Sequence, residues 1–262
     1  MSKHRPRKRF GQHFLTDPGV IDAIIDAIAP RENDNIVEIG PGHGAITLPI
    51  SARCAQLHAI ELDRDLAARL RTQFAGNDGV TIHEADALTF DYSQLGADLR
   101  VVGNLPYNIS TPLLFHLLEQ RGVVADMHFM LQKEVVDRMA AAPGSKAFGR
   151  LTIMLGCHLE IEALFEVDRH AFDPPPEVTS AVVRLRPLPA GSMRINDSQL
   201  LSELVAAAFS KRRKTLRNAL RNHAAEEDLH SLDIDPGLRP ENVAIRDWVS
   251  LANHLAAKAP RQ

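Results

Sequence analysis

Short apolar stretches alternate with amphipathic ones over the first 185 residues of the chain. The apolar stretches have the length of β-strands and lie at 36–39, 57–60, 80–83, 100–103, 128–131, 157–161 and 180–185. Helical periodicity fills most of the intervals, as at 65–74, 111–120 and 133–141. This alternation is typical of a parallel sheet with helices on both faces, so the pattern predicts an α/β fold.

A helix is predicted ahead of the first long strand. Asp17 is a suitable N-cap, and Pro18 suits the first helical turn. Apolar residues then recur at helical spacing from Val20 to Ile28, and Pro30 ends the pattern.

The pattern changes near the segment 187–191, which contains two prolines and a glycine and is predicted to be a linker. Beyond it, apolar residues recur at helical spacing over 201–209 and again over 248–255. We therefore predict two domains, a larger one at 1–190 that carries the sheet and a small helical one at 191–262.

Composition narrows the class of protein. Of the 262 residues, 45% are apolar, which is enough for a proper core. No stretch approaches 18 consecutive apolar residues, so we expect no membrane-spanning helix. The basic N-terminus has no apolar stretch behind it, and Cys54 and Cys157 lie far apart without metal-ligand spacing. These features predict a cytoplasmic protein without a structural metal.

Charge is unevenly distributed along the chain. The net charge of −3 by itself argues against nucleic-acid binding. However, the segments 3–9 and 211–221 each carry several Lys and Arg residues and no acid. Such segments produce local positive fields that attract phosphate backbones. The alternative interpretation is that both are solvated basic segments without a partner.

A glycine-rich turn and two acids follow the first three strands. The first strand runs into Gly40–Gly44, and glycine there lets the backbone approach a ligand closely. Glu61 ends the second strand, where an acid can accept both hydroxyls of a ribose, and Asp86 follows the third, where it can accept from an adenine amine. Nicotinamide enzymes use a similar loop and acid, so these features alone leave the cofactor open.

The sequence Asn104–Leu105–Pro106–Tyr107 follows the fourth strand. The exocyclic amine of adenine is a poor nucleophile because its lone pair is delocalised into the ring. The Asn104 side-chain oxygen and the Leu105 carbonyl are suited to accept its two N–H bonds and favour a pyramidal nitrogen as charge develops. Pro106 stiffens the turn, and Tyr107 can stack on an extruded base. A proline-containing turn with a packed tyrosine is the structural alternative.

With these motifs, the sequence resembles the ribosomal RNA adenine dimethyltransferase family, in its bacterial small-subunit branch linked to kasugamycin sensitivity. The resemblance spans nearly the whole chain and rests on motifs in a fixed order, at 11–15, 38–44, 61–63, 86–88, 104–110, 131–135, 172–178 and 208–216. It implies a Rossmann-like class I S-adenosylmethionine methyltransferase sheet followed by a small all-helical domain.

The resemblance also implies roles for individual residues. S-adenosylmethionine would contact His13, Leu15, Gly40, Glu61, Asp86 and Asn104. Tyr107 and Phe172 would hold the target adenine between them. The family usually has Asn where this chain has His13, although both side chains can donate a hydrogen bond. The implied substrate is a pair of adjacent adenosines in the 3′-terminal hairpin loop of 16S ribosomal RNA, each of which receives two methyl groups.

Two other functions are compatible with parts of the sequence. DNA adenine and protein glutamine methyltransferases present a planar nitrogen to a similar turn, so the motif at Asn104 does not separate them from an RNA enzyme. A ribosome-assembly factor with little need of catalysis is the second alternative. The basic segments and the full-length resemblance favour an enzyme that docks on the small ribosomal subunit, and we expect it to be a monomer.

Overall fold

The computed structural model describes residues 13–211 and 213–258, which form two compact units. The described part of residues 1–136 joins 162–187 in the first unit, and 137–161 joins the C-terminal residues from 188 in the second. Within the described residues, no helix has the length and apolar character needed to cross a membrane. The N-terminal basic segment 3–9 lies outside the described residues.

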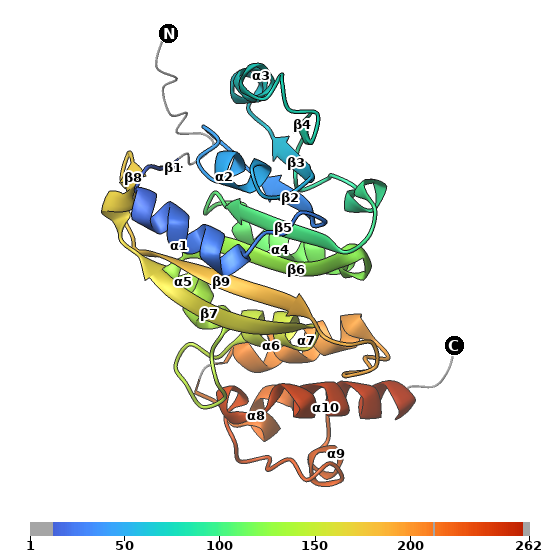
Figure 1. Cartoon of the computed structure of the whole chain (residues 1–262). Helices are drawn as coiled ribbons and strands as arrows, with labels where there is room; N and C mark the ends of the chain where they lie inside the picture. The colour runs from blue at the N-terminus through green and yellow to red at the C-terminus, as the bar shows by residue number, and fades with distance from the viewer. Residues whose placement is uncertain (1–12, 212, 259–262) are drawn as a thin grey trace. The chain divides into compact units, whose positions relative to one another are not determined.

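The largest sheet has seven strands in the order β4-β3-β2-β5-β6-β9-β7 (Figure 1). The strands are Asn35–Ile39 (β2), Gln56–Glu61 (β3), Val80–Glu84 (β4), Leu99–Asn104 (β5), Val124–Gln132 (β6), Leu159–Val167 (β7) and Ser180–Pro187 (β9). β2 to β6 pair in parallel, as the strand–helix alternation predicts. β9 instead pairs antiparallel with β6, so the expectation of a wholly parallel sheet is wrong at this side. Parallel neighbours in a sheet need a crossover connection, usually a helix, whereas a strand joined without one, such as β9, can pair antiparallel.

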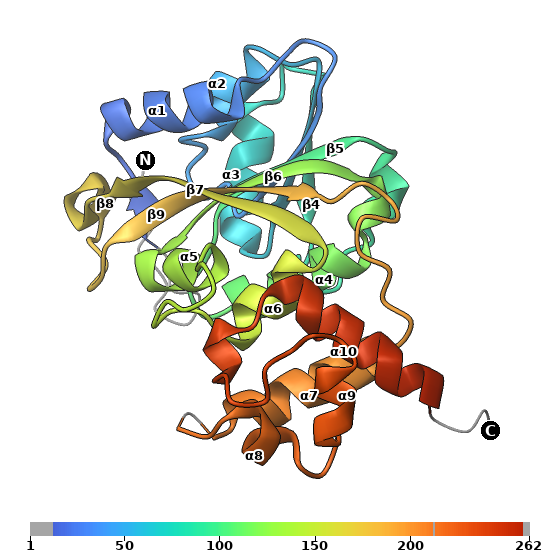
Figure 2. The same ribbon diagram turned by 90° about the horizontal axis from the view of Figure 1, so that it is seen from below.

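Helices lie on both faces of the sheet in the first unit. α1 and α2 lie on one face, and α4 lies on the other (Figure 2). Across the described chain, the helices are Pro18–Ile28 (α1), Thr47–Ser51 (α2), Arg64–Gln73 (α3), Ser110–Glu119 (α4), Lys133–Met139 (α5), Arg150–Gly156 (α6), Ser198–Phe209 (α7), Leu216–Leu220 (α8), Glu226–His230 (α9) and Ile245–Lys258 (α10).

The first helix begins where the sequence predicts. The Asp17 carboxylate accepts a hydrogen bond of 3.0 Å from the Val20 N–H, and Pro18 occupies the first turn. Ile24 and Ile28 are buried in the core against the sheet. α1 is thereby fixed to the sheet, just after the segment that reaches the site described below.

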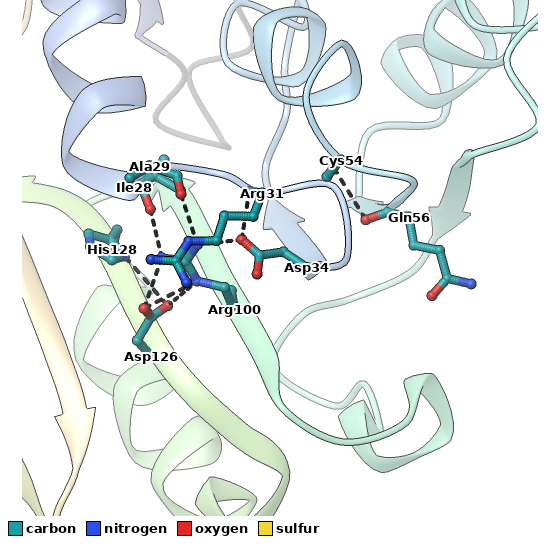
Figure 3. A network of polar contacts seen from close by, with 9 residues as sticks. All are labelled: Ile28, Ala29, Arg31, Asp34, Cys54, Gln56, Arg100, Asp126 and His128. Carbon is teal, nitrogen blue, oxygen red and sulfur yellow. Dashed lines mark hydrogen bonds and ion pairs between the residues drawn. The ribbon is translucent and has the colours of Figure 1, made fainter.

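Arg100 fixes the other end of α1 (Figure 3). Its guanidinium donates to the Ile28 carbonyl at 2.6 Å and pairs with Asp34 at 2.6 Å and Asp126 at 2.9 Å. A cation at a helix C-terminus satisfies carbonyls that have no partner within the helix and interacts favourably with the helix dipole. Arg100 therefore joins α1, the start of β2 and the middle of the sheet.

A second, two-stranded sheet was not predicted from the pattern. Phe14–Leu15 (β1) pairs antiparallel with Phe172–Asp173 (β8), with Phe14 opposite Asp173 and Leu15 opposite Phe172. Two-residue strands are too short to give a periodic signal. This pairing brings the N-terminal segment beside a part of the chain that lies far away in sequence.

The second unit is built around a helical core. Trp248 of α10 is fully buried together with Leu204 of α7 and Leu220 of α8. Ile153 of α6 belongs to the same core, although it lies within the range 1–190 that the sequence pattern assigns to the first domain. The predicted domains 1–190 and 191–262 therefore differ in their bounds from the two compact units, and they stay a prediction about which part of the chain has which function.

Candidate active site

A cavity of about 320 Å³ opens in the first unit beyond the carboxyl ends of the parallel strands. Open α/β sheets bind ligands at this edge, and the volume is in the range of small-molecule sites. Nearly all the predicted site residues line it, namely His13, Leu15, Gly40, Glu61, Asp86, Asn104, Leu105, Pro106 and Tyr107. They meet because most of them directly follow strands that end at the same edge.

The glycine-rich turn forms one wall of the cavity. Gly40 and Gly42 have φ values of +66° and +60°, in the left-handed region that favours glycine. A Cβ on Gly42 would also lie 3.1 Å from the Phe14 ring, which in turn packs against His43 at 4.0 Å between ring centroids. The turn thus depends on glycine both for its backbone conformation and for its contact with β1.

Glu61 is held at the end of β3 by backbone donors. Its two carboxylate oxygens accept N–H bonds from Gly42 at 3.2 Å and from Asp63 at 2.8 Å. Burial raises the pKa of Glu61, while these two N–H groups pull the pKa down. A carboxylate has further lone pairs, so Glu61 can still accept from a ligand while it holds the glycine turn.

Glu38 is a cavity residue to which the sequence pattern assigns no role. It is 2% exposed, and its Oε2 has no hydrogen-bond partner among the described residues. Burial raises the pKa of Glu38 to about 7; the Thr47 hydroxyl offsets part of this effect, and the Glu61 carboxylate adds to it. The sequence did carry a signal for Glu38, because an acid near the end of a buried strand needs a partner.

Asp86 follows β4 and is fixed by its own turn. Its Oδ1 accepts from the Leu88 N–H at 2.9 Å, as in an Asx turn. This bond holds the Asp86 carboxylate at the cavity wall. Asp86 therefore presents a fixed carboxylate at the cavity wall, and its role as acceptor for a ligand amine stays a prediction.

Asn104 ends β5 with its side-chain amide oriented by a backbone group. Its Nδ2 donates to the carbonyl oxygen of His13 at 3.1 Å. The preceding residue, Gly103, comes so close to β2 that a Cβ would lie 2.5 Å from the Ile39 carbonyl oxygen. A glycine inside a strand is a known sign of such an approach, and this signal was present in the sequence.

Tyr107 is fixed from β9. Its hydroxyl and the Ser180 hydroxyl are 2.8 Å apart, and Ser180 is fully buried. Burial raises the pKa of Tyr107, and the hydrogen bond with Ser180 offsets part of this effect. Its ring lies near-parallel to that of His13, with 6.0 Å between centroids and 26° between planes. The contact with Ser180 spans 73 residues and leaves no local signal in the sequence.

Phe172 is the one predicted site residue that does not line the cavity. Its side chain is 4% exposed and belongs to the core that includes Leu15 and α1. Phe172 is therefore buried in this core, opposite Leu15 in the pairing of β1 with β8.

The charge of the cavity distinguishes between cofactors. Its wall carries three carboxyl groups, from Glu38, Glu61 and Asp86, and no Lys or Arg side chain among the described residues. A dinucleotide would bring phosphates next to these acids, which is unfavourable. A cationic ligand such as a sulfonium suits this wall better. In the same described ranges, no group of three or more potential ligands could hold a metal ion.

The basic segment 211–221 is only partly helical. Lys214 precedes α8, Arg217 lies within it, and Arg221 caps its end. The spacing of Lys214, Arg217 and Arg221 would put all three on one face of a helix, but α8 begins after Lys214, so Lys214 does not share that face. Arg217 pairs with Glu226 at 3.1 Å, and both side chains are substantially exposed. Arg212 lies outside the described residues.

The sequence model of the family described as ribosomal RNA adenine dimethylase matches residues 3–257. The chain belongs to this family. Relatives at high identity cover essentially the whole chain. One from Aromatoleum aromaticum, named ribosomal RNA small subunit methyltransferase A, is 56% identical over 100% of this chain and 98% of its own length. Another of the same name, from Chromobacterium violaceum, is 53% identical over the full length of both.

Two solved structures are similar in fold to this chain. A dimethyladenosine transferase from Plasmodium falciparum has a TM-score of 0.82 and 25% identity, covering 94% of this chain and 98% of that one. The 23S rRNA methyltransferase ErmE has a TM-score of 0.76 and 26% identity, covering 93% and 99%. These neighbours agree with a Rossmann-like methyltransferase sheet and a helical C-terminal region.

Proposed function

We propose that this chain is an S-adenosylmethionine-dependent dimethyltransferase that acts on the N6 amines of two adjacent adenosines in the 3′-terminal hairpin of 16S ribosomal RNA. The family match over residues 3–257 and the names of the full-length relatives support it. The observation that carries the chemistry is the oriented Asn104 amide at the wall of an acidic cavity.

The residues of the cavity fit S-adenosylmethionine. In this proposal Glu61 accepts from the ribose hydroxyls, Asp86 accepts from the adenine amine, and Leu15 and Gly40 contact the ligand, and all four line the cavity. Glu38 offers an unpartnered buried carboxyl oxygen to a cation. When bound, the cofactor supplies a methyl group on a positively charged sulfur.

The residues of the catalytic turn act on the target base. With Nδ2 of Asn104 engaged by His13, its Oδ1 is the end available to accept an N–H bond from the adenine amine. In this proposal the Leu105 carbonyl is the second acceptor, so that the nitrogen lone pair can point away from both. Tyr107, fixed through Ser180, offers its ring face to an extruded base. The amine can lose its proton after transfer, so no side chain is needed as a base for attack.

Phe172 stays a predicted second face for the adenine. Because its side chain is 4% exposed in the core that includes Leu15, this role would require a movement that uncovers the ring.

We assign RNA docking to the predicted domain 191–262 and its basic segment 211–221, and we place the enzyme with maturing small subunits in the cytoplasm as a monomer. The decisive experiment incubates immature small subunits or duplex DNA with the protein and S-adenosylmethionine. Mass spectrometry of the 3′ hairpin should find two dimethyladenosines that depend on the protein. Methylation of DNA in preference to subunits would contradict the proposal.

A further inference from the structure

Residue 13 is connected to three parts of the site. Its backbone carbonyl accepts the Asn104 Nδ2 bond at 3.1 Å. Its ring Nδ1 lies 2.8 Å from the Pro174 carbonyl oxygen, and the ring faces that of Tyr107 with 6.0 Å between centroids. All these groups belong to the first unit.

The first contact decides which end of the Asn104 amide meets a substrate. A carboxamide has an acceptor oxygen on one side and a donor NH2 on the other. A carbonyl oxygen can only accept, so Nδ2 must face His13 and Oδ1 must face away. An amide turned the other way would present N–H groups to an adenine amine that also donates. Orientation of this one group therefore determines whether the site attracts or repels the amine.

The second contact holds the carbonyl that sets this orientation. Because the Pro174 carbonyl also can only accept, His13 Nδ1 must carry the proton and donate it. The bond lies next to the pairing of Phe14 with Asp173 and connects residue 13 to the residue that follows β8. Loss of the donor would leave the His13 carbonyl supported only by the short strand that follows it.

We propose that His13 is a positioning residue, whose bond to Pro174 holds its own carbonyl so that Asn104 presents its oxygen to the target amine. The effect on turnover rests on the proposed function above. The orientation of the Asn104 amide does not depend on it.

Two variants separate the hydrogen bond from the ring. His13→Phe keeps an aromatic ring facing Tyr107 and removes the donor, whereas His13→Asn removes the ring and keeps an N–H donor. NMR of the 15N-labelled free protein follows the Asn104 side-chain NH2 pair, which is identified by its absence in Asn104→Asp. We expect slowed hydrogen exchange of this pair in the wild type and in His13→Asn, and fast exchange in His13→Phe.

Turnover should follow the same order. On small subunits, His13→Phe should lower kcat about tenfold, as for one lost hydrogen bond, with an unchanged KM for the subunit. His13→Asn should recover most of this loss. The opposite order, in which Phe retains and Asn loses both signals, would assign the effect to ring packing and overturn the proposal, as would exchange that is equal in all three proteins. If the wild type fails to methylate subunits, the proposed function fails, while the amide exchange still decides the role of His13.

Discussion

The carboxyl group of Glu38 lies near that of Glu61 inside a cavity wall without Lys or Arg among the described residues. Burial lifts the pKa of Glu38 to about 7, and the negative charge of Glu61 contributes to the shift. Glu38 is therefore about half protonated near neutral pH, and a cationic ligand would favour its ionised form.

This arrangement predicts a specific dependence of stability on pH. The folded pKa of about 7 exceeds the ordinary value of 4.5, so between these pH values the folded chain keeps a proton that the unfolded chain has released. Stability should fall as pH rises from 4.5 to 7 and then level off. Glu38→Gln should remove this loss, worth at most about 3 kcal/mol at pH 8. Urea unfolding at several pH values measures the free energy of unfolding of both proteins. If that free energy changes with pH equally in the wild type and in Glu38→Gln, the assignment is contradicted.

Glu61→Ala should weaken S-adenosylmethionine binding by about 1.5–3 kcal/mol, because it removes charged acceptors for the ribose. The same carboxylate holds the Gly42 and Asp63 N–H groups, so some stability is lost as well. Calorimetry should be run at a temperature where melting curves show the variant folded. Glu84→Ala is the matched control. Glu84 lies opposite Glu61 in the register of β3 and β4, but it does not line the cavity. Unchanged affinity in the Glu61 variant would remove Glu61 from the cofactor site.

Asn104→Ala should act on chemistry more than on binding. It deletes an acceptor whose interaction strengthens as the amine gains charge, so turnover should fall roughly 10²–10³-fold, much more than cofactor affinity falls. Single-turnover methylation of small subunits, combined with calorimetry for the cofactor, separates the two effects. Near-normal turnover would mean that another group orients the amine.

Replacement of Arg217 and Arg221 by Ala should weaken subunit binding and flatten its salt dependence. The log–log slope should fall by about one unit for each phosphate that the variant no longer binds. Arg217 shares its guanidinium with Glu226, so Arg221 is expected to contribute more. Exposed Arg31 and Arg53 lie outside the proposed docking domain, and their double replacement is a control of equal charge. If the two double variants respond alike across a salt series, only net charge matters and the segment is not a docking surface.

Local signals predicted the elements that surround the site. Asp17 and Pro18 placed the start of α1, and the strand ends placed Gly40, Glu61 and Asn104 at one edge. These residues converge because parallel strands end on the same side, a consequence of topology that the alternating pattern already contains.

Contacts between distant segments could not be predicted in this way. The antiparallel direction of β9, the Tyr107–Ser180 contact and the burial of Phe172 all depend on how segments far apart in sequence pair. Glu38 was visible in the sequence, but its lack of a partner is a property of packing. The residues of the site were therefore easier to predict from the sequence than the long-range contacts that hold them in place.

The pairing of β1 with β8 bears on how the enzyme is synthesised. Residue 13 leaves the ribosome early, yet its partner at Pro174 follows 161 residues later. Until that segment has emerged, the His13 carbonyl lacks its support and the Asn104 amide is free to turn. A nascent chain, or a fragment that ends before β8, therefore carries every residue of the catalytic turn without its finished geometry. Completion of the site is therefore tied to completion of the sheet domain.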